Sequence, residues 1–334
     1  MPELRIDPIS GLRVIVAGER GARPGAWLQT EARPPIDPET DPFLEGHEDR
    51  TPPEVFAARP DGAAPDSPGW RVRVVPNKFP ALAPGEADDL DPLEAGRGEQ
   101  DLFATRPASG AHEVVVNGPE PVSSLLDLGP DGLAAAMGVW RERMRFHSGT
   151  GYVHVIVNEG RQAGASLPHT HAQLYALPFV PSAVARERER FTAYHDRTQG
   201  RNLLADLVQE EVRRRERLVA VDSEAVLICP FASRVPFHLQ LVPREPAPRF
   251  EDDGPLGAAL LHDALARLAK ALGDVPPFNL WVRTAPRGAQ SFCWRIDLLP
   301  RLAHPAGLEM GAGVQLCVLA PERAAAMLRE NATA

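Results

Sequence analysis

The segment HTHAQ (169–173) carries two histidines and a glutamine at alternate positions. In a β-strand, this spacing places the side chains of His169, His171 and Gln173 on one face. A neutral imidazole is a good nucleophile at about pH 7, and a neighbouring amide can donate a hydrogen bond to an oxygen that becomes negative. The row is therefore typical of nucleophilic attack on a phosphorus atom.

The loop that precedes this row, NEGRQAGASLP (158–168), contains mostly small residues in its second half. Small residues allow backbone N–H groups to approach an anion closely, and the hydroxyl of Ser166 is a further donor. The loop therefore predicts a phosphate-binding segment next to the row.

Alternating and helical hydrophobic patterns predict the elements that must position these residues. Helices are expected at about 130–146, 183–215 and 256–272, and a long irregular connection at 32–67. Strands are expected near 11–18, 70–75, 113–117, 152–158, 173–177, 218–221, 225–229, 237–242, 278–283, 292–298 and 314–319. Because strands and helices do not alternate strictly, the pattern favours an α+β fold over a doubly wound one.

Two decapeptides, HTHAQLYALP (169–178) and SFCWRIDLLP (291–300), suggest an internal duplication. Each reads as a strand, ends in Leu-Pro and follows a loop that contains glycine. Matched to one another, they place Ser291, Cys293 and Arg295 opposite the residues of the row. We therefore expect an N-terminal half (1–180) with the catalytic row and a C-terminal half (181–334) with a degenerate site; chance similarity of two short strands is the alternative.

Composition excludes several other classes of protein. Lys and Arg number 36 against 45 Asp and Glu, a net charge of −9, so no broad cationic surface is expected for a nucleic-acid polymer. The three cysteines lie far apart without CxxC spacing, which argues against a disulfide framework and fits a reducing cytoplasm. We find no apolar run of membrane-spanning length and no export signal, and expect a cytoplasmic protein without a membrane partner.

The segment GASLPHTHAQL (164–174) resembles the signature of the galactose-1-phosphate uridylyltransferases. They are a branch of the histidine-triad superfamily in which glutamine replaces the last triad histidine. Further segments resemble the same family in the same order: RIDPISGLRVIVAGERGARP (5–24), TPPEV (51–55), RVVPNKFPAL (73–82), CPFASRVPF (229–237) and WRIDLLPRLAHPAGLE (294–309). The resemblance implies two fused histidine-triad-like halves, with mostly antiparallel sheets flanked by helices.

The resemblance also implies a role for individual residues. His171 would attack the α-phosphorus of a sugar nucleotide and become nucleotidylated, while Gln173 would hold the transferred phosphoryl group. His169 would orient the nucleophile strand or contact phosphate. The remaining substrate-binding residues implied are Asn158, Gly164 and Ser166 around the phosphates, Arg20 and Arg23 as phosphate-binding arginines, and Asn77 and Phe79 in the nucleoside pocket.

The implied activity moves a nucleoside monophosphate, UMP-like, between sugar 1-phosphates, as a UDP-glucose:hexose-1-phosphate uridylyltransferase does. The partners would be a nucleotide-sugar, a sugar 1-phosphate and a second copy of the chain, because members of the family are dimers with shared sites. Two alternatives stay open: a sugar-nucleotide phosphorylase or hydrolase, and a non-catalytic nucleotide-binding protein.

The chain departs from the family at its zinc site. The positions of the four family ligands hold Asp41, Leu44, Pro121 and His169, and leucine and proline side chains cannot coordinate a metal. We therefore expect no metal cofactor, although Asp41, Glu45, His47 and His112 could rebuild a site. The histidines of a second metal site found in some members fall on Arg283, Arg295 and Asp297.

Overall fold

The computed structural model describes residues 1–22, 33–60, 62–85, 105 and 107–332 of the 334-residue chain. In this part, ten strands form a large sheet: β3 (Phe56–Ala58), β4 (Val72–Pro76), β5 (Ala111–Val116), β6 (Tyr152–Glu159), β7 (His171–Leu177), β8 (Leu218–Val221), β9 (Ala225–Ile228), β10 (Leu239–Pro243), β11 (Phe278–Arg283) and β12 (Arg295–Pro300). A small sheet holds β1 (Glu3–Ile6), β2 (Arg13–Val16) and β13 (Gln315–Cys317). The α-helices are α1 (Gly129–Phe146), α2 (Ser182–Arg197), α3 (Leu203–Arg214), α4 (Ala258–Leu272), α5 (Gly307–Ala312) and α6 (Pro321–Glu330).

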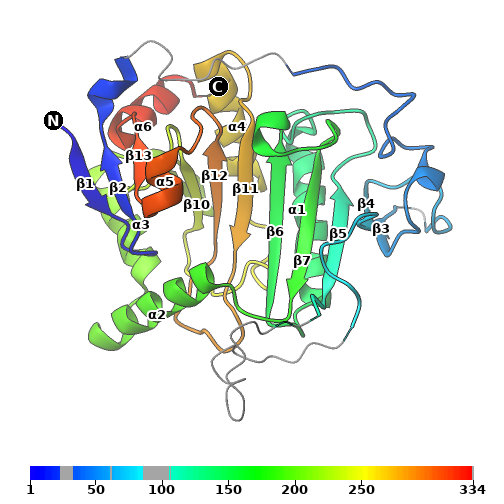
Figure 1. Cartoon of the computed structure of the whole chain (residues 1–334), viewed down its shortest axis with the longest axis horizontal. Coiled ribbons are helices and arrows are strands. Elements are labelled where there is room, and N and C mark those ends of the chain that lie inside the picture. Colours follow the sequence, from blue (N-terminus) through cyan, green and yellow to red (C-terminus); the bar gives the residue numbers. More distant parts are fainter. Residues whose placement is uncertain (23–32, 61, 86–104, 106, 333–334) are drawn as a thin grey trace.

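The large sheet has the order β3-β4-β5-β7-β6-β11-β12-β10-β9-β8, and its neighbouring strands pair antiparallel (Figure 1). The only parallel strand pair in the described part joins β13 to β2 in the small sheet. The predicted α+β fold with mostly antiparallel sheets is confirmed. No helix in these described ranges combines the length and the apolar character that crossing a membrane requires.

The order of the strands repeats within the sheet. From each outer edge inward, it runs β3-β4-β5-β7-β6 in one half and β8-β9-β10-β12-β11 in the other. Helix α1 connects β5 to β6, and α4 likewise connects β10 to β11. Strands β7 and β12, which carry the two matching decapeptides, thus occupy equivalent places. Because the sheet continues from β6 to β11, a division into two domains at residue 180 stays a prediction.

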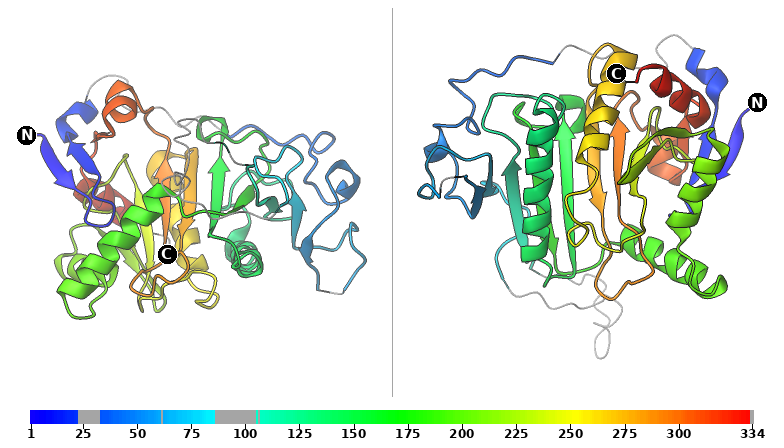
Figure 2. Two further views of the ribbon diagram at one scale, coloured as in Figure 1. Left: turned by 60° about the horizontal axis from the view of Figure 1, so that its bottom comes forward. Right: turned by 180° about the vertical axis from the view of Figure 1, so that it is seen from behind.

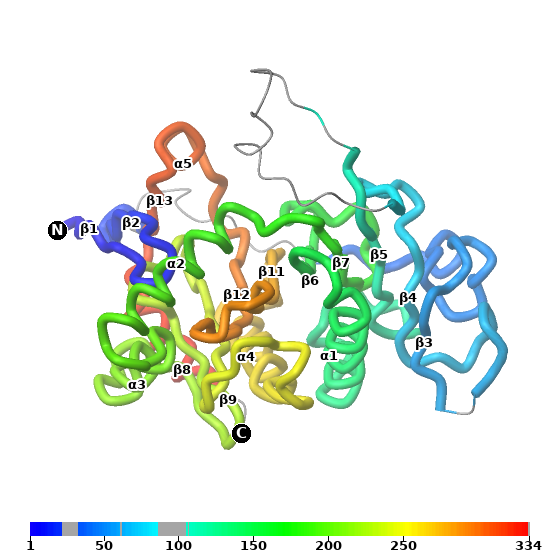
Figure 3. Tube along the Cα trace, turned by 90° about the horizontal axis from the view of Figure 1, so that it is seen from below, coloured from blue at the N-terminus to red at the C-terminus, as the bar shows by residue number. Residues whose placement is uncertain are grey.

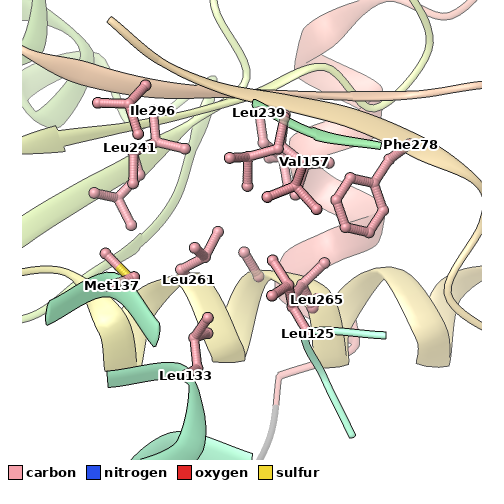
Figure 4. Packing of buried hydrophobic residues seen from close by; sticks show 14 of the residues in the cluster. Leu125, Leu133, Met137, Val157, Leu239, Leu241, Leu261, Leu265, Phe278 and Ile296 are labelled. Atoms are coloured by element: carbon pink, nitrogen blue, oxygen red, sulfur yellow. The ribbon is translucent and has the colours of Figure 1, made fainter. Parts of the chain in front are cut away.

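Helices α1 and α4 lie next to each other on one face of the large sheet (Figure 2, right). Their apolar residues Leu133 and Met137 (α1) and Leu261 and Leu265 (α4) pack against sheet residues such as Val157 (Figure 4). On β7, the alternate residues Ala172, Leu174 and Ala176 are buried in this core. The intervening residues His171, Gln173 and Tyr175 therefore lie on the opposite face of the sheet.

The structure contains elements that the sequence pattern did not predict. Strands β1 and β3 and helices α5 and α6 are additional, and β3 lies inside the expected irregular connection. The expected helix at 183–215 is two helices, which a turn separates at Gly200 and Asn202. Gly200 has a φ of 107°, and the Asn202 side chain caps α3 by accepting hydrogen bonds from its first N–H groups. The additional elements β1, β3 and α5 contain only 4, 3 and 6 residues, which is too few for a hydrophobic period to be recognised.

Buried ion pairs occupy the place in the second half that corresponds to the catalytic row. Arg295, which matches Gln173, donates two hydrogen bonds of 3.1 and 3.0 Å to Glu187 of α2. Its Nε lies 3.0 Å from Asp297, and Arg283 lies 3.4 Å from Glu187. Burial alone would raise the pKa of Asp297, but Arg295 lowers it well below its ordinary range. These charges hold α2 against the sheet.

We expect Glu187→Ala to destabilise the protein by about 3–5 kcal/mol, because it leaves the buried Arg295 without its counter-charge. The matched control is Glu189→Ala, which removes an exposed carboxylate from the same helix and should cost less than about 0.5 kcal/mol. Urea unfolding of the three proteins measures the difference. Equal midpoints for the two variants would show that the ion pairs do not stabilise the fold.

Candidate active site

One hydrogen bond determines the chemical state of His171. Its Nδ1 lies 2.8 Å from the backbone carbonyl of His169, and since a carbonyl only accepts, Nδ1 carries the proton and donates. Burial lowers the pKa of His171 below its ordinary value of 6.5, more than the hydrogen bond raises it, and the side chain is only 6 % exposed. The ring is therefore neutral at about pH 7, with a lone pair on Nε2.

His169 was predicted to share a strand face with His171 and Gln173, but it lies in the bend before β7 and is fully buried. Its Nδ1 is 2.6 Å from the Asp41 carboxylate, and its Nε2 is 2.9 Å from the carbonyl of Gly118. Both nitrogens lie within hydrogen-bond distance of an acceptor oxygen, so the protein occupies both ends of the ring. Burial raises the pKa of Asp41, but the hydrogen bonds from His169 and Phe43, together with the charge interactions of His169 and His47, outweigh it and the pKa is lowered. The two roles expected for His169, orienting the strand or contacting phosphate, stay predictions; in this structure both ring nitrogens are engaged by protein groups.

The loop that carries Asp41 packs against the same two histidines. Asp41 accepts a hydrogen bond of 3.0 Å from the N–H of Phe43, and the Phe43 ring lies 5.3 Å from the His171 ring. Phe43 is buried in a small apolar cluster with Trp70 and Val114. Packing and hydrogen bonds thus hold this loop against the row.

The residues at the family's zinc positions do not fit a zinc ion. Leu44 and Pro121 have no donor atom, and the ring nitrogens of His169 are already occupied. The alternative set is not assembled either: Glu45 accepts from Gly69, His47 bonds the carbonyl of Asp41, and His112 bonds Gln173. Within the ranges that the structure describes, no three His, Cys, Asp or Glu side chains lie together as a metal site requires.

Gln173 lies two residues after His171 on the same face of β7. Its Oε1 is 3.0 Å from Nε2 of His112 on β5 and accepts a hydrogen bond of 2.9 Å from the hydroxyl of Tyr175. Asn77, predicted to line the nucleoside pocket, lies 3.1 Å from the same His112 nitrogen. The structure therefore brings the predicted phosphoryl and nucleoside residues together through His112.

A residue of the second half holds the loop at 158–168, the predicted phosphate-binding segment. Asn279 on β11 donates hydrogen bonds of 2.8 Å to Oδ1 of Asn158 and to the carbonyl of Ala163. Gly160, with a φ of 81°, lies so close to Pro277 that a Cβ would come within 2.8 Å of it. Only glycine fits there without strain. Because Asn279 donates to Oδ1 of Asn158, the NH2 group of the Asn158 amide is left to donate.

Gly164 and Ser166 lie exposed on this loop, and Gly164 has a φ of 91°. Ser166 also lines a cavity of about 660 Å³ between the loop and the start of β11. The cavity lining includes Glu159, whose pKa burial raises to about 7, but neither His171 nor Gln173. This cavity is therefore separate from the nucleophile.

Phe79 is hydrogen-bonded to Asn77, whereas Arg20 lies on a different element. The N–H of Phe79 donates to Oδ1 of Asn77 at 2.8 Å, and its ring is 84 % exposed. Arg20 lies exposed in η1 (Gly18–Ala22), next to the small sheet and beyond the second half from β7 (Figures 1 and 3). The preceding strand β2 pairs with β13 and packs against Ala232 and Cys317 of the second half, and the phosphate contact of Arg20 stays a prediction. Arg23 lies outside the described residues.

Tyr175 and Asn279 escaped the sequence analysis, and His112 was considered there only as a candidate metal ligand. Tyr175 continues the alternate row of β7, so the spacing of two could have indicated it. His112 and Asn279 stand on other strands, and only the strand pairing brings them to Gln173 and Asn158.

Known proteins resemble this chain in sequence and in fold. A family described as "Galactose-1-phosphate uridyl transferase, N-terminal domain" matches residues 1–181. ADP-glucose phosphorylase of Arabidopsis thaliana is 30% identical over 98% of this chain and 93% of its own, and a probable galactose-1-phosphate uridylyltransferase of Drosophila melanogaster is 27% identical over 98% and 95%. The crystal structure of an Arabidopsis thaliana ADP-glucose phosphorylase with bound ADP-glucose superposes with a TM-score of 0.80, at 27% identity over all of both chains. The chain therefore belongs to the galactose-1-phosphate uridylyltransferase family.

Proposed function

We propose that this protein is a nucleotidyltransferase that works through a covalent nucleotidyl-histidine on His171. The observation that carries the proposal is the hydrogen bond from Nδ1 of His171 to the His169 carbonyl, which leaves the Nε2 lone pair available at neutral pH. In the first step Nε2 forms a bond to the α-phosphorus, and the bond from that phosphorus to the bridging oxygen breaks. The sugar 1-phosphate leaves with the electron pair.

The second step reverses the first with a different oxygen nucleophile. An oxygen of the acceptor phosphate attacks the α-phosphorus, the N–P bond breaks, and Nε2 recovers its lone pair. We infer that the NH2 groups of Gln173 and Asn158, with the loop at Gly164 and Ser166, bind the non-bridging oxygens as negative charge develops there. The exposed ring of Phe79 and the amide of Asn77 would contact the nucleoside.

Two pairs of substrates follow from the relatives. The first candidate is transfer of a UMP-like group from UDP-glucose to another hexose 1-phosphate, as in the uridylyltransferases. The second is phosphorolysis, in which orthophosphate accepts the nucleotide; it is favoured by the 30% identity to ADP-glucose phosphorylase over nearly the whole chain. The same row of β7 serves both reactions, and also hydrolysis when water is the acceptor.

We expect the protein, incubated with UDP-glucose or ADP-glucose, to gain the mass of one nucleoside monophosphate, and His171→Ala to abolish both the adduct and turnover. Intact-mass spectrometry measures the adduct, and circular dichroism confirms that the variant is folded. Release of the adduct by galactose 1-phosphate, orthophosphate or buffer alone then identifies the acceptor. His195→Ala, which removes an exposed histidine on α2, is the control and should keep the adduct. An adduct that persists in His171→Ala would disprove the assignment.

We also propose that the active protein is a cytoplasmic homodimer whose partner subunit supplies Arg20 to each row. The proposal is supported by the position of η1, which lies beyond the second half from β7 in the same chain (Figure 3). A second, symmetrically placed chain could present the same arginine across the interface. The three buried free cysteines are compatible with a reducing compartment.

The shared site predicts complementation between two inactive variants. Arg20→Ala and His171→Ala should each be nearly inactive alone. Equal mixing with subunit exchange makes half the molecules heterodimers, and in each of these one of the two sites has both residues. Activity should therefore return to about a quarter of the wild-type value. If the mixture stays inactive although mass spectrometry shows heterodimers, Arg20 does not act across the interface.

We propose, further, that the protein functions without the family's zinc, because the ion pair of Asp41 and His169 takes the place of metal coordination. Elemental analysis of protein purified without added metal should find far less than one zinc per chain. The melting temperature should not change on chelation, since a structural zinc would contribute folding free energy. About one zinc per chain, lost with unfolding on chelation, would show that other residues coordinate the metal.

A further inference from the structure

We propose that His112 and Tyr175 are positioning residues that fix the side-chain amide of Gln173 in its donating orientation. The inference rests on the proposed function, in which Gln173 donates to the transferred phosphoryl group. An amide has an accepting and a donating end that differ little in shape, so it needs partners that distinguish the two ends. His112 and Tyr175 both lie against the oxygen end.

The backbone determines which nitrogen of His112 carries the proton. The N–H of Ala81 donates to Nδ1 of His112 at 3.1 Å, and a backbone N–H cannot accept, so Nδ1 holds a lone pair. Burial lowers the pKa of His112, despite the opposing effect of its hydrogen bond to Gln173, and the ring is therefore neutral at about pH 7. The single ring proton is on Nε2, where it donates to Oε1 of Gln173. The NH2 of Asn77 lies near but cannot donate to a nitrogen that is itself a donor.

Tyr175 completes the arrangement. Its ring stacks on His112, with centroids 4.1 Å apart and an angle of 24° between the planes, and its hydroxyl donates to the same Oε1. A carbonyl oxygen has two lone pairs, and these two donors occupy both. A flipped amide would instead present its NH2 to the Nε2–H of His112, which cannot accept, and the Tyr175 hydroxyl would have to turn from donor to acceptor. The orientation with NH2 toward the reaction is therefore the one that the network stabilises.

His112 also has a second contact that Tyr175 lacks. Through Ala81 it holds the segment after β4, which carries Asn77 and Phe79. Loss of the imidazole should therefore affect nucleotide binding as well as the chemical step. Loss of the Tyr175 hydroxyl should affect the chemical step alone.

A double-mutant cycle tests the inference. Tyr175→Phe keeps the stacked ring and removes one hydrogen bond, and we expect kcat to fall about 3- to 10-fold with KM unchanged. Gln173→Ala should slow the reaction about 10²-fold, as loss of one oxyanion donor typically does. In the Gln173→Ala background, Tyr175→Phe should have no further effect, because its target is gone. The same factor in both backgrounds would show that Tyr175 does not act through Gln173.

Two further variants serve as a control for Tyr175→Phe and as a test of His112. Tyr194→Phe removes a tyrosine hydroxyl whose hydrogen bond of 2.6 Å goes to Asp206, away from the row, and should leave kcat and KM unchanged. His112→Phe should lower kcat and also raise KM for the nucleotide-sugar. An effect of His112→Phe on the melting temperature alone would overturn its positioning role.

A measurement without substrate separates this inference from the proposed function. In the full-length protein labelled with 15N-histidine, His112 should be neutral at about pH 7 with its proton on Nε2; the spectrum of His112→Phe assigns the signal. If the unmutated protein turned over no nucleotide-sugar, the proposed function would be contradicted. The nuclear magnetic resonance result would still decide whether His112 donates to Gln173. A proton on Nδ1, or a charged ring, would overturn the proposed orientation of Gln173.

Discussion

The hydrogen bond from Nδ1 of His171 to the carbonyl of His169 is the contact on which the site depends. It makes one imidazole nitrogen a donor and leaves a lone pair on the other, and it forms only while the carbonyl stays in place. Three contacts hold that carbonyl's residue and its neighbour: Asp41 and Gly118 bind the His169 ring, and Thr170 donates its N–H to Val122 at 2.8 Å. Much of the first half thus serves to fix one peptide group.

The ion pair of Asp41 and His169 illustrates how a hydrogen bond and a metal ion differ as structural links. A tetrahedral zinc ion joins four ligands and so can connect several segments at one point. Asp41 and His169 join only two segments, and the buried ring of Phe43 supplies the remaining contact with the row. The pair is fully buried, and breaking such a pair by removing one partner is costly because the other charge loses its compensation.

The second half repeats the frame of the first without its chemistry. Where the first half has His171, the second has the buried Cys293, and where the first has Gln173, the second has Arg295, which Glu187 and Asp297 engage. The second half nevertheless contributes to the site, because β11 lies next to β6 and its Asn279 orients Asn158. Because the duplicated sheet is continuous across its centre, a residue of the second half can orient a residue in the first half.

The sequence by itself determined what depends on neighbours along the chain. The spacing of two in HTHAQ placed His171 and Gln173 on one face of β7, although His169 lies before the strand, and the helical spacing at 130–146 predicted α1. The loss of ligands at Leu44 and Pro121 predicts that the family's zinc is not bound. Tertiary structure alone decided the contacts between distant residues: Asp41 with His169, 128 positions apart, Asn158 with Asn279, 121 apart, and His112 with Gln173, 61 apart. It also separated Arg20 from the row. The reason is physical: periodicity records which face of an element is buried, whereas hydrogen-bond partners are fixed by strand order and register, which local patterns do not specify.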